Sequence, residues 1–269
     1  MANAAYTSGF NTDALFVAAK AATVFAAHEQ SLFLGGGMVP VVNAPNGLLQ
    51  VPELAAVTAT TLTSEAAPGV DLDAVLPADT KNTIQCDIYA ARSVLRDLGA
   101  IDPSEIGRVL GNAVSKAFDT AVITAMNGLT ASTSDSDPMT VDALFDAAAQ
   151  IRGNGETGAL MGIVSAAEAA NLMKDIGTNA YGGGDFQSEA MRNGFLGQIA
   201  GIRMFQSSYI SGANKGFVFA GDAMRIAMQK NVDIETARRP EAVGQDIVAS
   251  LHAGVGVIDA GRGVKLVNV

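Results

Sequence analysis

The longest helical periodicity in the chain lies between residues 102 and 128. Apolar residues recur there at intervals of three and four positions, which places them along one stripe of an α-helix. At about 1.5 Å per residue the helix would be roughly 37 Å long. We expect the rest of the chain to be organised around it. The stripe comprises Ile106, Val109, Leu110, Ala113, Val114, Ala117, Phe118, Ala121, Val122, Ala125 and Met126.

Residues at both ends predict where this helix begins and ends. Asp102 is a suitable N-cap, Pro103 occupies the first helical position, and Glu105 completes a capping box. Asn127-Gly128 predicts a left-handed stop.

Gly107 and Gly111 lie one turn apart inside the same helix, where each costs roughly 0.5–1 kcal/mol relative to Ala. One interpretation is a close backbone approach or a bend early in the helix. The other is an ordinary core helix that tolerates two glycines. The sequence leaves both open.

The N-terminal part predicts a loose arm at residues 1–10, followed by a helix. Asn11 or Thr12 would cap this helix, which is expected to run to about Gln30. Gly35-Gly36-Gly37 then interrupts the chain. The expected apolar side of the helix carries Leu15, Phe16, Ala19, Ala22, Phe25 and Ala26.

Short strand-like runs alternate with turn signals between Met38 and Gln85. An isolated two-stranded hairpin is at best marginally stable in water. We therefore expect this excursion to lie on its own body or on a neighbouring subunit. The strand candidates are Val39–Val42, Gly47–Val51, Ala56–Thr63 and Thr80–Tyr89, with a turn at Asn46-Gly47 and a loop tip at Pro68-Gly69 and Pro77.

Helices and short strands intermix between residues 129 and 229, which is typical of an α/β or α+β subdomain. Its boundary is the polar loop Leu129–Met139. The expected elements are a Thr140-capped helix to about Arg152, a buried strand Gly158–Val164, a Ser165-capped helix to about Ile176, a turn at Tyr181–Gly184, one or two strands in 195–210, a strand Phe217–Ala220 and a short helix from Asp222 to about Met228.

From Val232 onward the chain alternates as strands do. We expect these strands to form a sheet against the apolar stripe of helix 102–128. That helix and the C-terminal strands would then make one body, interrupted by an insertion at 139–229.

Composition favours a protein whose surface is used in contacts. Only 16% of the residues are charged, against roughly 25% in soluble domains, and mean hydropathy is +0.26. A net charge of -10 argues against direct binding of phosphate backbones, which requires Lys and Arg. The single cysteine excludes an internal disulfide and fits a reducing cytoplasm. The N-terminal residues predict neither a signal peptide nor a membrane span.

Candidate chemistry is sparse. Cys86 would need a histidine base, and His28 and His252 lie on segments that no pattern brings together, so a buried strand position is the better interpretation of Cys86. The glycine clusters at 35–37, 182–184 and 254–256 match no phosphate-loop motif, and loop flexibility or strand kinks explain them.

Two charged clusters each allow a binding role or a simple solvent-exposed position. Asp135 and Asp137 could contact calcium but lack the spacing of a calcium loop, so solvated loop carboxylates are favoured. The run 238–241 could pair with acidic residues of a neighbouring copy or form a solvated hairpin tip. We predict no catalytic, cofactor-binding or metal-binding residue and no enzymatic activity.

The order of arm, long hairpin, capped helix, inserted subdomain and strand-rich return resembles the major capsid protein of tailed double-stranded DNA bacteriophages. The local pieces that carry the resemblance are Ile84–Tyr89, Gly197–Ile202 and Ala223–Ala227. It implies an α+β Hong Kong 97-like capsid fold. In that fold 1–34 would be the N-terminal arm, 35–86 the extended E-loop, 87–138 the peripheral domain with its spine helix, 139–229 the axial domain, and 230–269 the C-terminal strands of the peripheral domain.

The resemblance implies a structural subunit of an icosahedral virion shell, assembled in the host cytoplasm. Copies would form pentamers and hexamers that enclose packaged double-stranded DNA without binding it specifically. Because the sequence shows no scaffolding extension, any scaffold is expected to be a separate protein, and portal and cement proteins are possible further partners. Lys81 lies on the excursion, but no acceptor is identifiable, so no cross-link is predicted.

Two other functions stay open. One is the shell of a bacterial nanocompartment, built on the same fold around an enzyme cargo. The other is a small α/β enzyme with its site in residues 139–229.

Overall fold

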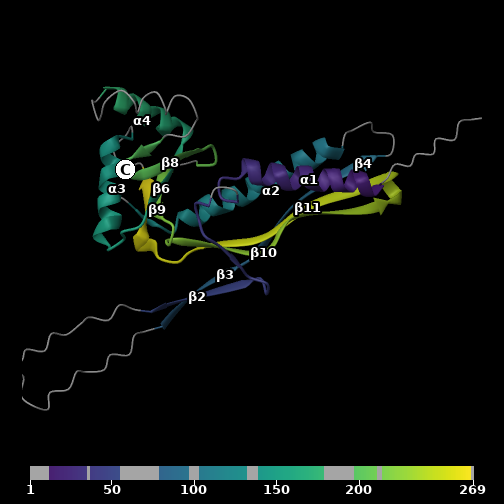
Figure 1. Ribbon diagram of the computed structural model, residues 1–269, viewed down its shortest axis with the longest axis horizontal. Coiled ribbons are helices and arrows are strands. Elements are labelled where there is room, and N and C mark those ends of the chain that lie inside the picture. The colour runs from purple at the N-terminus through teal and green to yellow at the C-terminus, as the bar shows by residue number, and fades with distance from the viewer. Residues whose placement is uncertain are drawn as a thin grey trace, which may run out of the picture.

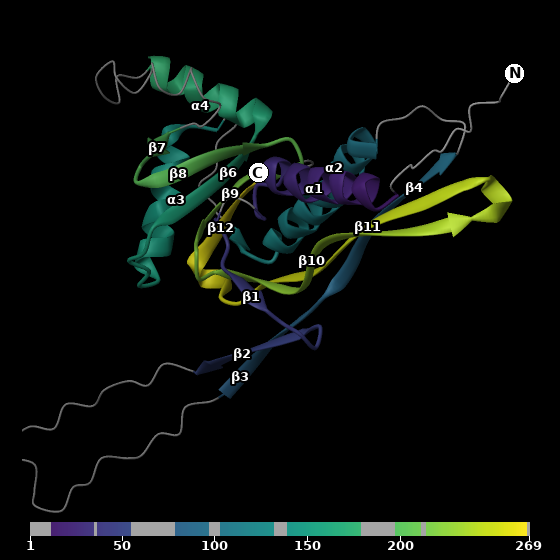
Figure 2. The ribbon, with the colours of Figure 1, turned by 45° about the vertical axis from the view of Figure 1, so that its right-hand side comes forward.

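The computed structural model describes residues 12–34, 37–54, 79–96, 103–131, 139–178, 197–210 and 214–267. Within these ranges, two bodies lie side by side and a two-stranded hairpin projects from their edge (Figures 1 and 2). Several expectations lie outside the described residues. They are the arm at 1–10, the N-cap Asp102, the run Ala56–Thr63, the loop tip at Pro68-Gly69 and Pro77, the carboxylates Asp135 and Asp137, and the turn at Tyr181–Gly184.

The first body packs two helices on a four-stranded sheet, as expected for the long helix and the C-terminal strands. The helices are α1 (Thr12–Gln30) and α2 (Pro103–Met126), and both lie over the same sheet (Figure 1). The sheet order is β1-β10-β11-β4, with β1 parallel to β10 and the other pairs antiparallel. Its strands are β1 (Val41–Asn43), β4 (Asp87–Arg96), β10 (Met224–Arg239) and β11 (Gly244–Val257).

The buried face of α2 differs from the predicted stripe. One row of it follows every fourth residue from Ile106, and the adjoining row, which contains Gly107, Gly111, Ser115, Asp119 and Ile123, is buried as well. Val109 is 61% exposed, and Ala113 and Ala117 are exposed as well, so the prediction was wrong for these three residues. The buried ridge consists of Ile106, Leu110, Val114, Phe118, Val122 and Met126.

The predicted left-handed stop of α2 is also wrong. Gly128 is absent from the residues with positive φ, and the helix instead tightens through hydrogen bonds between residues three apart. The amide of Gly128 donates to the carbonyl of Ala125 at 3.0 Å, and the amide of Leu129 donates to that of Met126 at 3.0 Å. This tightening buries Leu129 in the core and directs the chain into β5 (Thr130–Ala131).

The second body is a six-stranded sheet in the order β5-β12-β9-β6-β8-β7, covered by two helices. Its helices and strands lie close to where they were predicted, but Thr140, at the N-cap position of α3, makes no side-chain capping hydrogen bond. Ser165 Oγ accepts the amide of Glu168 at the start of α4, as expected of a cap. The elements are α3 (Val141–Gly153), α4 (Ala166–Thr178), β6 (Leu160–Ser165), β7 (Gln198–Ile199), β8 (Ile202–Ser207), β9 (Asn214–Ala220) and β12 (Gly263–Val267).

The short helix predicted from Asp222 to about Met228 is wrong. Asp222 and Ala223 lie in a turn, and from Met224 onward the chain forms β10, where Ile226 pairs with Val41 on one side and with Val255 on the other. The apolar spacing of Met224, Ile226 and Met228 also fits the period of two of a strand. Hydrogen-bonded pairing with a strand on each side explains why this segment is a strand and not a helix.

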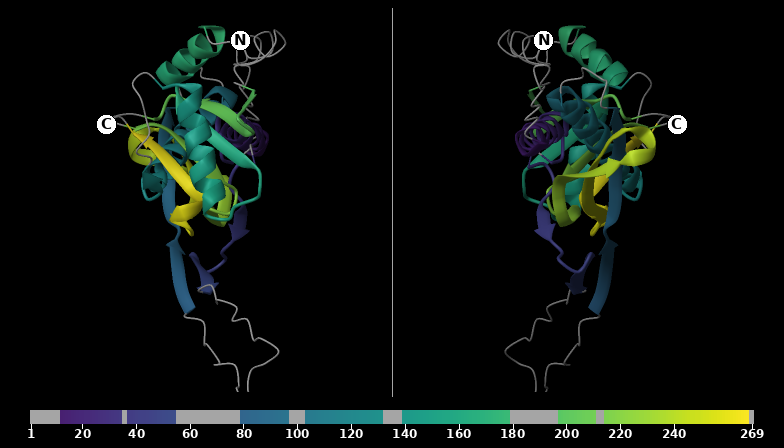
Figure 3. Two further views of the ribbon diagram at one scale, coloured as in Figure 1. Left: turned by 90° about the vertical axis from the view of Figure 1, so that its left-hand side faces the viewer. Right: turned by 90° about the vertical axis from the view of Figure 1, so that its right-hand side faces the viewer.

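The projecting hairpin consists of β2 (Leu48–Leu54) and β3 (Asp79–Gln85), paired antiparallel as a separate two-stranded sheet. The predicted turn at Asn46-Gly47 is present, and Gly47 has a φ of 71°. It leads from β1 into β2, but the two strands pair with different partners. The views along the molecule show the hairpin leaving the two bodies (Figure 3).

Candidate assembly surfaces

The hairpin is anchored to the body at its root by a small apolar cluster. Ile84 is buried against Ala44 and Ala227, and Leu49 and Ile258 pack at its side. Among the residues of β2 and β3 whose burial the structure describes, Ile84 is the one that is buried. The strands therefore extend outward with little core of their own.

Glycines in β11 allow the hairpin root to cross this strand closely. A Cβ on Gly254 would overlap the carbonyl oxygen of Gln85, and a Cβ on Gly256 would lie 2.7 Å from Ile84 Cγ1. The third glycine cluster of the sequence thus serves a close backbone approach, as strand glycines often do. Neither loop flexibility nor a phosphate site accounts for it.

Cys86 lies at the break between β3 and β4 and is half-buried, which corrects the expected buried strand position. Its Sγ lies 3.5 Å from the carbonyl oxygen of Ala227. Burial, and secondarily the charge of Asp87, raises the pKa of the thiol, which disfavours the reactive thiolate. The strand pairing places His252 opposite Ile88, and so near Cys86 in the fold, which the sequence did not reveal. The Cys86 thiol nevertheless contacts the carbonyl of Ala227.

The two glycines of α2 mark a close approach of α1, which decides between the two interpretations of these residues. A Cβ on Gly111 would lie 2.5 Å from the carbonyl oxygen of Thr23, and one on Gly107 would overlap the carbonyl oxygen of Ala19. Thr23 Oγ1 also donates to the carbonyl of Gly107 at 2.9 Å. The helices can touch this closely because neither carries a bulky side chain at the crossing.

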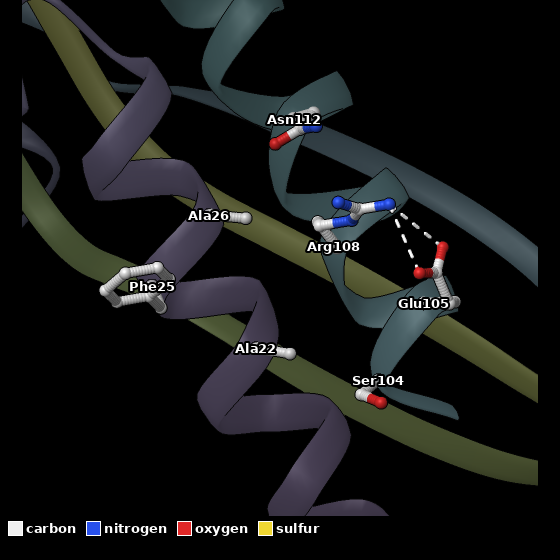
Figure 4. Close-up of a pocket in the computed structure, with 7 residues that line it drawn as sticks. All are labelled: Ala22, Phe25, Ala26, Ser104, Glu105, Arg108 and Asn112. Carbon is white, nitrogen blue, oxygen red and sulfur yellow. Dashed lines mark hydrogen bonds and ion pairs between the residues drawn. The ribbon is translucent and has the colours of Figure 1, made fainter. Parts of the chain in front are cut away.

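A groove of about 580 Å³ runs along the outer side of this helix pair (Figure 4). Ala22 and Ala26 point across it toward α2, where Arg108 and Glu105 form an ion pair at 3.1 Å. Phe25, predicted on the apolar side of α1, is 68% exposed at this groove, which corrects the prediction. The buried side of α1 instead carries small residues that fit the glycines.

A buried carboxylate joins the end of α1 to the middle of α2. Asp119 accepts hydrogen bonds from Ser31 Oγ at 2.6 Å and from the amide of Leu32 at 3.1 Å. Burial raises the pKa of Asp119 to about 6, although both hydrogen bonds lower it. Sequence analysis missed this residue, and the available signal was an acidic residue beside Phe118 on the buried face.

The run 238–241 lies at the tip of the β10–β11 hairpin. Pro240–Ala242 form a 3-10 turn there, and Val243, which is exposed, follows with a φ of 48°. Arg239 lies 3.9 Å from Glu241. The tip position is thus settled, and pairing with acidic residues of another copy stays a prediction.

Within the described ranges, no three His, Cys, Asp or Glu side chains are grouped so that they could hold a metal ion. In the same part of the chain, no helix has the length and apolar character needed to cross a membrane.

A family model described as phage capsid protein matches residues 94–266, well over half of the chain. That range contains α2, both long strands and the whole second body. A comparison with curated proteins found no match.

Among solved structures, the chain is similar to one in the capsid of the cyanophage P-SCSP1u, with 18% identity over 86% of each chain and a TM-score of 0.67. It is also similar to the mature capsid of bacteriophage PhiM1, with 17% identity over 87% of each chain and a TM-score of 0.62. A virus-like particle from Pyrococcus furiosus matches with 14% identity over 93% of this chain and 98% of that chain, with a TM-score of 0.66. These similarities show the mixed α+β fold of Hong Kong 97-like capsid structures.

Proposed function

The chain belongs to the phage capsid protein family, and we propose that its copies assemble as pentamers and hexamers. It is a self-assembling structural subunit of a virion shell. These capsomers close an icosahedral shell around packaged double-stranded DNA. The subunit carries out no chemical reaction in this role.

The observation that carries the proposal is the β2–β3 hairpin. It leaves the body with Ile84 as its buried anchor, and Leu48 beside it is 44% exposed. Because a two-stranded hairpin gains little stability alone, it needs another surface. A neighbouring copy in a capsomer supplies one.

We assign the parts of the chain to the elements of this fold as follows. Residues 1–34 form the N-terminal arm, 35–86 the E-loop, 87–138 the peripheral domain with α2 as spine helix, 139–229 the axial domain, and 230–269 the C-terminal strands of the peripheral domain. The strand pairing supports moving β5 and β12 into the axial unit and β1 and residues 224–229 into the peripheral domain.

The acidic charge fits a container for DNA. A net charge of -10 leaves closely packed DNA free to move, since basic patches would adsorb it. Separate scaffolding, portal and cement proteins are the further partners of this proposal.

A nanocompartment shell is the second candidate. The similarity to the virus-like particle from Pyrococcus furiosus, over 93% of this chain, is the observation that favours this second candidate. Cargo separates the two functions, because particles from infected or producing cells would contain nuclease-protected DNA in one case and an enzyme in the other.

Assembly itself can be tested with the purified chain. Negative-stain microscopy and gel filtration across salt and protein concentration are expected to show closed particles or their capsomers. A monomer or dimer under every condition, with scaffolding proteins from the producing cell supplied as well, would contradict the proposal.

A further inference from the structure

The chain passes between the two bodies at three places that lie side by side. It passes from α2 into β5, from β9 into β10, and from β11 into β12. The amide of Ile258 donates to the carbonyl of Ala223 at 2.8 Å, and Thr130 Oγ1 donates to the carbonyl of Ala260 at 2.8 Å. The two bodies therefore meet at one junction, visible where the yellow strands bend in Figure 2.

Arg262 lies at this junction and contacts carboxylates from three segments. Its Nη1 is 3.2 Å from Glu156 Oε2 in the loop after α3 and 3.8 Å from Asp222 Oδ2 in the β9–β10 turn. Its Nε is 3.0 Å from Asp259 Oδ2 in the β11–β12 turn. The Glu156 side chain is only 9% exposed and that of Arg262 is 43% exposed, so the carboxylate of this pair is shielded while the guanidinium still reaches solvent.

Two further contacts hold the same segments. Asn154 Nδ2, beside Glu156 in the loop after α3, donates to the carbonyl of Gly261 at 2.7 Å. Arg225 Nη2 donates to Asp222 Oδ1 at 2.6 Å. The loop after α3 and both inter-body turns thus form one connected polar network.

Apolar packing also joins the two bodies. Phe217, Phe219 and Ile163 of the six-stranded sheet share a cluster with Phe33 and Met126 of the first body. Hydrophobic attraction is non-directional. Hydrogen bonds from a planar guanidinium to carboxylates depend on orientation, and they therefore select one arrangement.

We propose that Arg262 fixes the angle between the two bodies of the subunit and thereby the curvature with which copies join. The inference rests on the proposed shell function, because the angle is expressed only when subunits close a particle. Glu156 and Asp259 are its main partners, and Asp222 links it to the second turn.

The test compares the diameters of particles assembled from the unmodified chain, Arg262→Gln and Arg262→Lys by cryo-electron microscopy. Arg262→Gln is expected to at least double the width of the diameter distribution, and Arg262→Lys, which keeps the charge, to restore part of the uniformity. Arg92→Gln is the control, since the Arg92–Asp246 pair lies inside one body and its loss should leave the width unchanged.

Glu156→Gln is the second variant in case Arg262→Gln does not fold, as judged by circular dichroism. It leaves Arg262 its contact with Asp259 and is expected to broaden the distribution as well. If the unmodified chain makes uniform particles and the folded variants make the same ones, the role of Arg262 is refuted and the shell function stands. If the unmodified chain makes no particles even with scaffolding proteins from the producing cell supplied, both fail.

Discussion

The helix–sheet body and the β2–β3 hairpin belong to the same chain but are stabilised in different ways. In the body, Phe118 of α2 is fully buried and meets Tyr89 of β4 edge to face, with ring centroids 5.6 Å apart. The hairpin has the buried anchor Ile84, and Leu48 beside it at the root is exposed. One region holds its own shape, and in the proposed function the other is completed by a neighbouring copy.

This difference explains how the chain combines a small share of charged residues with a folded core. The body buries enough apolar surface to fold, and the remaining neutral surface is available for copies. Variants in the body should therefore change the stability of the free subunit, while variants on the hairpin should change assembly.

Phe118→Ala should have the strongest effect on the body. Removing a fully buried aromatic ring that packs on Tyr89 is expected to lower the free energy of unfolding by about 3–5 kcal/mol. Urea unfolding of the free subunit measures it. Val109→Ala on the exposed side of α2 is the control, with a change below about 0.5 kcal/mol. Equal effects of the two substitutions would mean that Phe118 and Val109 are buried to the same extent, contrary to the structure.

Asp119→Asn should remove a pH dependence of the body. Because burial raises the folded-state pKa of Asp119 to about 6 from an ordinary value of 3.8, its contribution to stability is present at low pH and is lost as pH rises from about 4 to about 6. The loss is on the order of 2–3 kcal/mol. The free energy of unfolding of the unmodified chain, relative to the variant, should fall across that window and stay constant above pH 7.

Asp146→Asn is the matched control for this titration, because Asp146 is exposed on α3. Its unfolding free energy, relative to the unmodified chain, should show no such fall. A parallel pH profile for the unmodified chain and Asp119→Asn would contradict the assignment of the pH dependence to the buried carboxylate.

Gly107→Ala should separate α1 from α2. The added Cβ would overlap the carbonyl oxygen of Ala19, so about 1–3 kcal/mol of stability is expected to be lost although Ala favours a helix. Gly153→Ala at the end of α3 has no atom within 4 Å of its new Cβ and should change stability by less than about 1 kcal/mol. Thermal unfolding distinguishes them, and a gain in both would refute the close helix contact.

Leu48→Asn should have the smallest effect on the free subunit. Leu48 is exposed on the hairpin, so the free energy of unfolding is expected to change by less than about 0.5 kcal/mol. Assembly should require a higher protein concentration, measured by light scattering, because an apolar contact with a neighbour is lost. Unchanged assembly would place Leu48 outside the interface.

Local patterns predicted most elements, and tertiary contacts explain the failures. The helical period of α2, the Ser165 cap of α4 and the strand alternation after Val232 are properties of short stretches, and each matches the structure. The resemblance to phage capsid proteins is confirmed by the family model.

The errors occurred where a distant segment decided the outcome. Residues 224–228 form a strand because β1 and β11 flank them, and Phe25 is exposed because α1 turns its small residues toward the glycines of α2. The partners of Asp119 could not be found from the sequence, because Ser31 and Leu32 lie 88 and 87 residues away. The same holds for the pairing of Arg262 with Glu156, which lies 106 residues away.

Hydrogen exchange of the hairpin amides, residues 48–54 and 79–85, would compare the two regions directly in the free subunit and in assembled particles. We expect the hairpin amides to exchange quickly in the free subunit and to be protected at least tenfold in particles, while the amides of α2 are protected in both. Equal protection of the hairpin before and after assembly would show that it is stable on its own, and the dependence on a neighbouring copy would be refuted.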